Sequence, residues 1–337
     1  DSDPDGTGNL ACVYRRLKNN PRGFNCHFIT RKDYNLRSAF RFFFVKSFLL
    51  ATAKYVLLDN VFLPSAFLAF KKPVKVVQLW HGSGTIKKFG QDATKGLLHV
   101  LERRANRTYT HLIVNSGKIR DVFSSAFGIG KDKIYAVGSP RTDLFFSQED
   151  INRRKEQFFA KFPHLIGKRI YLYAPTFRDE DGAGNFELDF GMMERFLEKD
   201  SVLLVKLHPW LAGKVKGWSV YERILDFSGY HDIHTLMLIS DVLITDYSSL
   251  IFEYVLLKKP IVFFAYDLQE FKEKGRGFYE DYESYVPGPI VKTTPELIET
   301  LRKGEYDLDK VEEFAKRHYD FRDGKSTDRV IRLIFDP

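Results

Sequence analysis

The chain of 337 residues is long enough for two domains of ordinary size, and its 44% hydrophobic and 28% charged residues argue against disorder. Its formal net charge of +8 favours anionic partners such as phosphates or acidic lipids. The two cysteines, Cys12 and Cys26, argue against a disulfide scaffold or a zinc site and favour a reducing compartment.

The first 58 residues are predicted to form a loop and a basic, aromatic segment. Residues 1–9 read as a loop, and the missing starting methionine indicates that the natural N-terminus, with a first strand, lies upstream. No stretch reaches the roughly 18–20 apolar residues of a transmembrane helix. Residues 37–58 instead repeat basic side chains through a Phe- and Leu-rich background, which is typical of a helix at a membrane surface. The alternative is a buried helix followed by a strand from Lys54.

Runs rich in Val, Ile and Leu alternate with helical patterns along the rest of the chain. The first series covers residues 55–59, 75–80, 110–116 and 133–140. After a charged helical stretch at 151–165, the second series covers 169–176, 201–209, 241–249 and 260–267. Continuous apolar strands alternating with helices predict parallel sheets that are covered on both faces. The sequence therefore predicts two doubly wound α/β domains, at residues 1–155 and 156–315.

Polar side chains follow the predicted strands at the point where each strand ends. In open parallel sheets, ligands bind beyond the carboxyl ends of the strands. Because such residues come from both series, we expect a cleft between two sheets. The residues are His81, Ser139, Arg141, Thr176, Arg178, His208 and Asp246 to Ser249.

The motif W-H-G-S-G places a histidine in the first domain just after a predicted strand. His81 can act as a general base, because the pKa of an ordinary histidine lies near neutral pH. Gly82 and Gly84 let the backbone approach a ligand closely, and the two lysines that follow can bind an anion or a membrane surface. The alternative is a tight turn before a solvated basic segment.

Residues 241–264 contain the clearest anion-binding pattern of the second domain. A buried strand leads to Thr245 and Asp246, and Ser248 and Ser249 then begin a helix. Hydroxyls and free N–H groups at a helix start suit a pyrophosphate, and Glu253 in the same helix is expected to face that opening and hold ribose hydroxyls. The alternative is that Asp246 or Ser248 only caps the helix.

Other polar residues add candidate contacts to phosphate. Lys206 and His208 end a strand together, and an imidazole there can donate to a phosphoryl oxygen, although a single histidine is more often a packed or surface residue. Arg276 lies beside a glycine in a loop, where it can reach a phosphate. Residues 179–181 match an Asp-x-Asp pattern, but three consecutive acids in a Gly-rich loop usually form a solvated turn.

Several classes of function lack support in the sequence. No phosphate-binding loop of the G-x-x-x-x-G-K-[ST] type, no dinucleotide fingerprint and no nucleophile elbow occurs. The basic residues form no nucleic-acid module, so nucleic acid is not an expected partner. No cofactor is required, and a divalent metal is not indicated.

Taken together, the motifs "WHGSGTIKKFG", "YAPTFRDE", "VKLHP" and "DVLITDYSSLIFEYVLLKKPIVFF" resemble the CDP-glycerol glycerophosphotransferase family of teichoic acid synthesis. The resemblance runs from about residue 9 to residue 290, and it departs from the family where "GSG" replaces a frequent proline. It implies a GT-B-type architecture of two Rossmann-like domains facing a cleft, with residues 316–337 packing back toward the first domain. It also implies a peripheral protein at the inner face of a Gram-positive cell membrane, with residues 37–58 and 91–107 meeting an anionic surface.

The resemblance further implies a reaction and the residues that perform it. His81 and His208 fall on the two histidines regarded as essential in the family, and Thr245 to Ser249 fall on the segment that holds the donor. Glycerol phosphate would pass from CDP-glycerol to the lipid-linked disaccharide ManNAc-GlcNAc-diphosphoundecaprenol, with release of CMP and His81 as base. The chain length favours this primase reaction. Alternatives are a polymerase or ribitol phosphate transferase of the family, a GT-B glycosyltransferase that uses a nucleotide sugar, and a non-catalytic membrane-binding protein.

Overall fold

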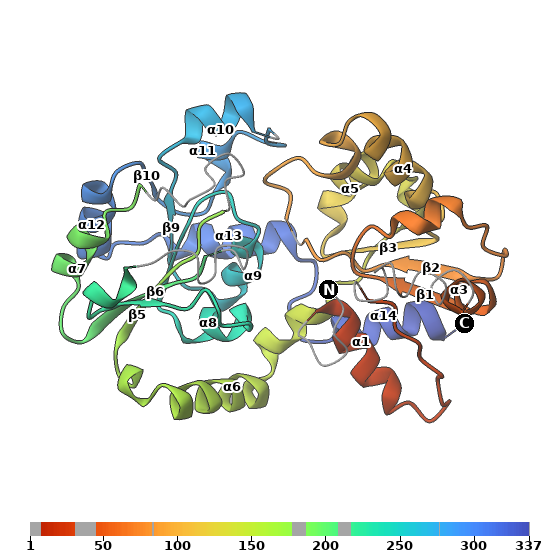
Figure 1. Ribbon diagram of the computed structural model, residues 1–337, viewed down its shortest axis with the longest axis horizontal. Helices are drawn as coiled ribbons and strands as arrows, with labels where there is room; N and C mark the ends of the chain where they lie inside the picture. The colour runs from red at the N-terminus through yellow and green to blue at the C-terminus, as the bar shows by residue number, and fades with distance from the viewer. Residues whose placement is uncertain are drawn as a thin grey trace. The chain divides into compact units, whose positions relative to one another are not determined.

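The computed structural model describes residues 8–30, 45–82, 84–176, 187–207, 217–275 and 277–336. The chain divides into two compact units (Figure 1). Unit 1 combines Asp1–Phe146 with Arg317–Pro337, and unit 2 is Ser147–Lys316. The boundary that the sequence predicts at residue 155 lies inside α6 (Gln148–Lys161), and this helix belongs to unit 2.

Unit 1 is built on a parallel sheet with the strand order β1-β2-β3-β4. Its strands are β1 (Tyr55–Leu58), β2 (Lys75–Gln78), β3 (His111–Val114) and β4 (Ile134–Ala136). Its α-helices in the described ranges are α1 (Asn9–Lys18), α3 (Ser47–Thr52), α4 (Gly96–Asn106), α5 (Arg120–Phe127) and α14 (Ser326–Phe335). Two 3₁₀ helices used below are η4 (Leu63–Phe67) and η8 (Pro140–Phe146).

Both faces of this sheet are covered, because successive strand residues point to opposite sides. On one side Val76 packs in a cluster with Phe123 of α5. On the other side Val77 packs with Val13 of α1 and Ile334 of α14. Burial of each such side chain stabilises the unit by roughly 1.5–3 kcal/mol. This explains why the strands consist almost entirely of apolar residues.

The C-terminal helix is fixed to unit 1 at its first turn. The carboxylate of Asp143 in η8 accepts the backbone N–H groups of Ser326 and Thr327, both at 2.8 Å. A negative charge at a helix start satisfies its unpaired N–H groups and complements the helix dipole. The last residues of the chain therefore complete the core of the unit that contains the first ones.

The described residues of unit 2 form a six-stranded parallel sheet with the strand order β10-β9-β8-β5-β6-β7. Its strands are β5 (Arg169–Tyr173), β6 (Ser201–Val205), β7 (Ile224–Asp226), β8 (Val242–Thr245), β9 (Ile261–Phe264) and β10 (Ile290–Val291). Its further α-helices in the described ranges are α7 (Phe190–Phe196), α8 (Ile233–Ile239), α9 (Leu250–Tyr254), α10 (Leu268–Lys274), α11 (Tyr282–Tyr285), α12 (Thr294–Lys303) and α13 (Leu308–His318), whose last residues enter unit 1.

Counted along the chain, these strands follow the order 3-2-1-4-5-6 of a Rossmann fold. Val205, Ile244 and Phe264 pack in one cluster with Met193 of α7 and Leu297 of α12. Helix α8 lies against β5, and Figure 1 shows α8 and α9 beside the same sheet. The order reverses between β5 and β8. In this fold, ligands bind beyond the carboxyl ends of the two strands at such a point.

The predicted parallel sheets are confirmed, but the strands are shorter than their apolar runs. The run 133–140 forms a strand only over Ile134–Ala136, because Gly138 has a φ of 92° and turns the chain. Residues 55–58 pair with β2, which confirms the strand predicted at 55–59 and favours the helix-then-strand alternative for the segment 37–58.

Three further expectations concern helices of unit 1. Residues 37–44 of the basic segment 37–58 lie outside the described residues, whereas Phe48 of α3 is 65% exposed. The helix expected at 91–107 begins at Gly96, and α1 begins at Asn9, where a loop was expected. In the described part of the chain, no helix combines the length and apolar character needed to cross a membrane.

Candidate functional site

His81 lies just beyond the end of β2, and its side chain is exposed. Its Nδ1 atom is 3.2 Å from the backbone carbonyl oxygen of Asp59, which follows β1. Since a carbonyl oxygen can only accept a hydrogen bond, this contact places the proton of the neutral imidazole on Nδ1 and the lone pair on Nε2. An exposed imidazole in this tautomer is suited to accept a proton from a substrate.

The residue before His81 has a strained backbone. Trp80 has a φ of 53°, in the left-handed region that costs a residue other than glycine about 1–3 kcal/mol. Its N–H donates to Oε1 of Gln78 at 3.0 Å, and its indole lies against the His81 ring with centroids 4.4 Å apart. A Cβ atom on Gly82 would come within 2.8 Å of the indole Nε1. Gly82 is therefore needed for the close approach of Trp80.

Asn9, which the sequence analysis missed, joins the predicted residues of unit 1. Its side-chain Nδ2 donates to the carbonyl oxygens of Trp80 at 2.6 Å and Leu79 at 3.4 Å. Its Oδ1 accepts the hydroxyl of Ser139 at 2.7 Å and the backbone N–H of Arg141 at 3.0 Å. The structure thus brings Ser139 and Arg141 to the loop that carries His81. The local signal, an asparagine before an apolar periodic run, reads merely as a helix start.

Asp59 completes the same cluster from the end of β1. Its Oδ2 accepts the N–H of Leu10 at 3.1 Å. Burial raises the pKa of the Asp59 carboxyl, and this N–H together with the positive charge of Arg141 acts in the opposite direction. The first turn of α1 therefore contacts both strand ends that border His81.

In unit 2, Thr176, Thr245 and Asp246 lie where the strand order reverses between β5 and β8. The Thr245 hydroxyl donates to the carbonyl oxygen of Ala174 at 2.7 Å, and Oδ1 of Asp246 accepts the N–H of Thr176 at 2.8 Å. Both Thr245 and Asp246 are buried. Their polar atoms therefore hold the ends of the two strands together.

The hydroxyls at the start of α9 differ in accessibility. Oγ of Ser248 accepts the N–H of Leu250 at 3.3 Å, but the N-cap residue of α9 is Ser249, which is exposed and makes no side-chain capping bond, so the alternative of a cap by Asp246 or Ser248 is wrong. Tyr247, which precedes the two serines, is held in place by two contacts. Its hydroxyl donates to Asp267 at 2.9 Å, and its ring stacks on Phe271 with centroids 4.0 Å apart. Burial raises the pKa of Tyr247 far above its ordinary value, so the hydroxyl remains a donor.

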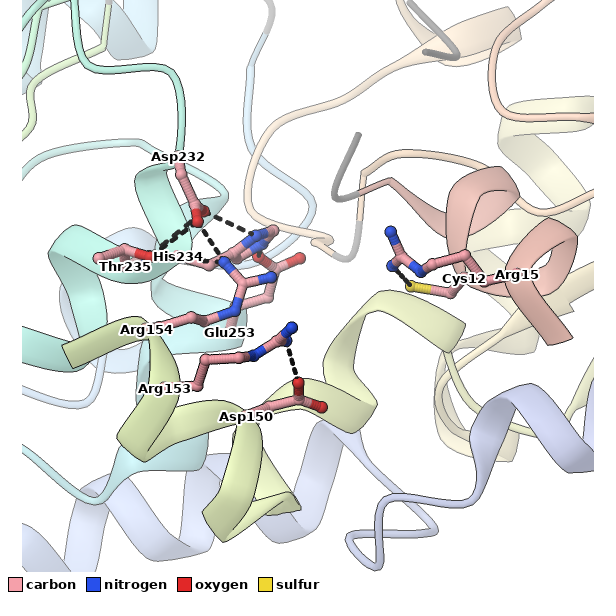
Figure 2. A network of polar contacts seen from close by, with 9 residues as sticks. All are labelled: Cys12, Arg15, Asp150, Arg153, Arg154, Asp232, His234, Thr235 and Glu253. Atoms are coloured by element: carbon pink, nitrogen blue, oxygen red, sulfur yellow. Dashed lines mark hydrogen bonds and ion pairs between the residues drawn. The ribbon is translucent and has the colours of Figure 1, made fainter. Parts of the chain in front are cut away.

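Glu253 does not face an opening, contrary to the sequence-based expectation. It is 2% exposed, and its Oε2 lies 3.0 Å from Nε2 of His234. Nδ1 of His234 is 3.9 Å from Asp232, which also forms an ion pair with Arg154 of α6. Figure 2 shows these four side chains converging from α6, α8 and α9. Glu253 is thus part of a buried polar network that anchors α9.

The remaining predicted residues are Lys206, Arg178, His208 and Arg276. Nζ of Lys206 donates to the carbonyl oxygen of Ser228 at 2.7 Å, and burial lowers the pKa of this half-buried lysine despite the charge of Asp226. Arg178, His208 and Arg276 lie outside the described residues, as do residues 179–181. Among the side chains that the structure describes, no group of three or more His, Cys, Asp or Glu residues is arranged to bind a metal.

Comparison with known proteins identifies the family. Residues 1–336 match the sequence profile of the family described as CDP-Glycerol:Poly(glycerophosphate) glycerophosphotransferase. The chain belongs to this family. The resemblance drawn from the motifs is therefore confirmed.

Individual relatives within the family differ in the polyol that their names specify. The chain is 34% identical to the teichoic acid poly(ribitol-phosphate) polymerase of Bacillus spizizenii, over 100% of this chain and 55% of that protein. It is 31% identical to the teichoic acid glycerol-phosphate primase of Bacillus subtilis, over 85% of this chain and 74% of that protein. The chain thus spans little more than half the length of the polymerase.

The family fold is also found in a solved structure. The wall teichoic acid polymerase TagF superposes with a TM-score of 0.76 at 26% identity, covering 97% of this chain and 84% of that one. Together with the two parallel sheets, this match confirms the predicted GT-B-type class with two Rossmann-like domains.

Proposed function

We propose that the chain transfers glycerol phosphate from CDP-glycerol to ManNAc-GlcNAc-diphosphoundecaprenol, releasing CMP, as a primase of teichoic acid synthesis. Membership of the glycerophosphotransferase family supports a CDP-activated polyol as donor. A histidine-substituted TagF has been soaked with CDPG, which supports the same class of donor. The observation that carries the proposal is His81, exposed beyond a strand end with its Nδ1 held by a carbonyl.

In the proposed reaction, an acceptor hydroxyl oxygen attacks the β-phosphorus of CDP-glycerol. A bond forms between this oxygen and the β-phosphorus, the bond from the β-phosphorus to the bridging oxygen breaks, and CMP leaves with that oxygen. Nε2 of His81 takes the hydroxyl proton. In phosphoryl transfer most of the catalysis is positioning and stabilisation of charge, so donors and cations around the phosphates account for the rest.

Unit 2 is proposed to bind the donor. Ser249 offers an exposed hydroxyl near the switch point of its sheet, next to Ser248. The cationic candidates Lys206, Arg178, His208 and Arg276 are proposed to stabilise the phosphoryl oxygens. Thr245, Asp246 and Glu253 are proposed to support this surface through their contacts with the protein itself.

The decisive experiment measures CMP release by chromatography from the purified protein, with CDP-glycerol and a lipid-linked ManNAc-GlcNAc-diphosphate analogue. Because a general base contributes about 10²–10⁴-fold in rate, His81→Ala should lower kcat by that factor and leave the Kd for CDP-glycerol unchanged. His99→Ala is the matched control, since Nδ1 of His99 also contacts a carbonyl, that of Thr94 at 3.1 Å. Full turnover in His81→Ala would remove the base assignment.

Mass spectrometry of the product separates the members of the family. One added glycerol phosphate supports the primase, whereas a ladder of products identifies a polymerase. A ribitol donor is the second candidate, because the relative named for poly(ribitol-phosphate) aligns over the whole of this chain. CMP formed from CDP-ribitol alone would establish it. Release of UMP or UDP from nucleotide sugars would instead indicate a glycosyltransferase.

We also propose peripheral binding of unit 1 to an anionic membrane at the cytoplasmic face. Phe67 of η4 and Leu97 of α4 are 69% and 73% exposed, and these two helices pack together. The guanidinium of Arg104 lies 5.6 Å from the Phe67 ring centroid, so basic and apolar groups share this surface. Such a mixture suits the boundary between acyl chains and anionic headgroups.

Vesicle co-sedimentation tests this surface. Leu97→Glu should release the protein from vesicles containing anionic lipid, because a carboxylate cannot enter the acyl region and is repelled by the headgroups. Ile166→Glu in unit 2 is the control, since Ile166 is similarly exposed at 64%. Equal binding of both variants would place the membrane contact elsewhere.

A further inference from the structure

The orientation of His81 depends on the peptide group that precedes it. The carbonyl group of Trp80 and the Cα atom of His81 lie in the same peptide plane. The direction of this carbonyl therefore fixes where the His81 Cα lies. Trp80 has a φ of 53°, an angle that is unfavourable for a bulky residue. Something beyond the loop must therefore hold this plane.

The contact that holds the plane comes from far along the chain. Nδ2 of Asn9 donates to the Trp80 carbonyl at 2.6 Å and, more weakly, to that of Leu79 at 3.4 Å. Asn9 is itself immobilised, because it is 1% exposed and its Oδ1 accepts both the Ser139 hydroxyl and the Arg141 N–H. The amide is therefore a rigid bridge between two loops that follow β2 and β4.

The neighbouring residue of α1 acts on the other contact of His81. Leu10 donates its N–H to Oδ2 of Asp59 at 3.1 Å, and the carbonyl of Asp59 contacts Nδ1 of the His81 ring. Two consecutive residues at the start of α1 thus bear on both the backbone and the ring of His81.

We propose that Asn9 is a positioning residue for His81, which sets the peptide plane before it and, through this plane, the distance from Nδ1 to the Asp59 carbonyl. The inference rests on the proposed function in taking His81 as the base. It goes further by giving the first turn of α1 a part in positioning that base.

The chemistry of the amide predicts which substitutions matter. Asn9→Asp keeps the shape and the acceptor for Ser139, but it removes both N–H donors and puts a carboxylate against two carbonyl oxygens. Asn9→Ser is the milder variant and retains one donor. Asn106→Ala is the matched control, because Asn106 is also 1% exposed and donates one bond, to the Phe127 carbonyl at 3.0 Å.

The first measurement is NMR of the histidine ring nitrogens, with the His81 signals among those of nine histidines assigned by comparison with His81→Ala. We expect the Nδ1–H tautomer of His81 in the unchanged protein. In folded Asn9→Asp or Asn9→Ser it should give way to a mixture of tautomers, and in Asn106→Ala it should persist. An unchanged tautomer in both folded Asn9 variants would overturn the proposal.

The second measurement is steady-state kinetics of CMP release. Misplacing a catalytic group by about 1 Å can cost 10²-fold, so Asn9→Asp should lower kcat by about 10–100-fold while KM for CDP-glycerol stays within about twofold. A loss confined to KM, or an equal loss of kcat in Asn106→Ala, would overturn the positioning role. The two failures remain distinct: if His81 is not the base, His81→Ala keeps its turnover, whereas the tautomer still reports on Asn9.

Discussion

The ends of the two parallel sheets use their polar residues in opposite ways. In unit 1, His81 is exposed, and the residues around it, Trp80 and Asn9, hold it in place. In unit 2, Thr245 and Asp246 are buried at the corresponding end of the sheet, and their side chains bind the backbone of the neighbouring strand. One sheet end exposes an imidazole, whereas the other uses its polar atoms to hold two strand ends together.

This difference shows that a polar residue after a strand can have two roles that sequence does not separate. Oxygen atoms at strand ends must be paired once they are buried, because an unsatisfied buried group costs about 1–3 kcal/mol. Thr245 satisfies the carbonyl of Ala174, so a change there should affect folding first. A change at His81 should affect turnover first, since the imidazole lies at the surface.

The buried pair of His234 and Glu253 offers the strongest test of this contrast. Glu253→Ala leaves His234 without its 3.0 Å partner in the interior of unit 2. Leaving a buried polar group without its hydrogen-bond partner typically costs about 1–3 kcal/mol, and we expect a loss of about that size in the free energy of unfolding of unit 2. Urea denaturation followed by circular dichroism measures it.

A matched surface pair and a milder variant sharpen the result. Glu299 pairs with Lys303 in α12, where both side chains are more than half exposed, so Glu299→Ala should leave the urea midpoint unchanged. Glu253→Gln keeps the shape and an acceptor, and it should cost less than Glu253→Ala. If Glu253→Gln instead left stability intact and weakened CDP-glycerol binding, Glu253 would hold the ribose, as its place in the sequence suggests.

The strands and their parallel arrangement could be predicted from sequence because they depend on local composition. A run such as residues 242–245 is apolar throughout, since both of its faces are covered, and this pattern requires no knowledge of its neighbours. The position of His81 beyond a strand end follows from the same pattern. The family could also be identified from its motifs, because several occur in order along most of the chain.

The role of Asn9 could not be predicted, because its partners lie 70 to 132 residues away in the sequence. The burial of Glu253 escaped prediction for a similar reason. Helical spacing shows that Glu253 lies on one side of α9, but only the packing of α8 determines that His234 meets it there. Long-range contacts between side chains and backbone depend on how helices and strands pack together. They leave no periodic pattern of residues in a single sequence.

The substitution Gly82→Ala should have a smaller effect, on turnover and not on the stability of the fold. Gly82→Ala would place a Cβ atom 2.8 Å from Nε1 of Trp80, and the indole must then move away from the His81 ring. We expect kcat to fall about tenfold, equivalent to ~1.4 kcal/mol in the barrier, with little change in the free energy of unfolding. Gly229→Ala is the control, since no atom lies within 4 Å of its added Cβ.

The double variant Gly82→Ala/Trp80→Phe tests whether the indole is the cause. A phenyl ring lacks the Nε1 atom that the new methyl group would meet, so the second substitution should recover part of the lost turnover. Independent, additive losses would show that Gly82 acts by other means, for example by allowing a ligand to approach the backbone. Partial rescue would show that the glycine is present for Trp80, and that internal packing sets the position of even an exposed residue such as His81.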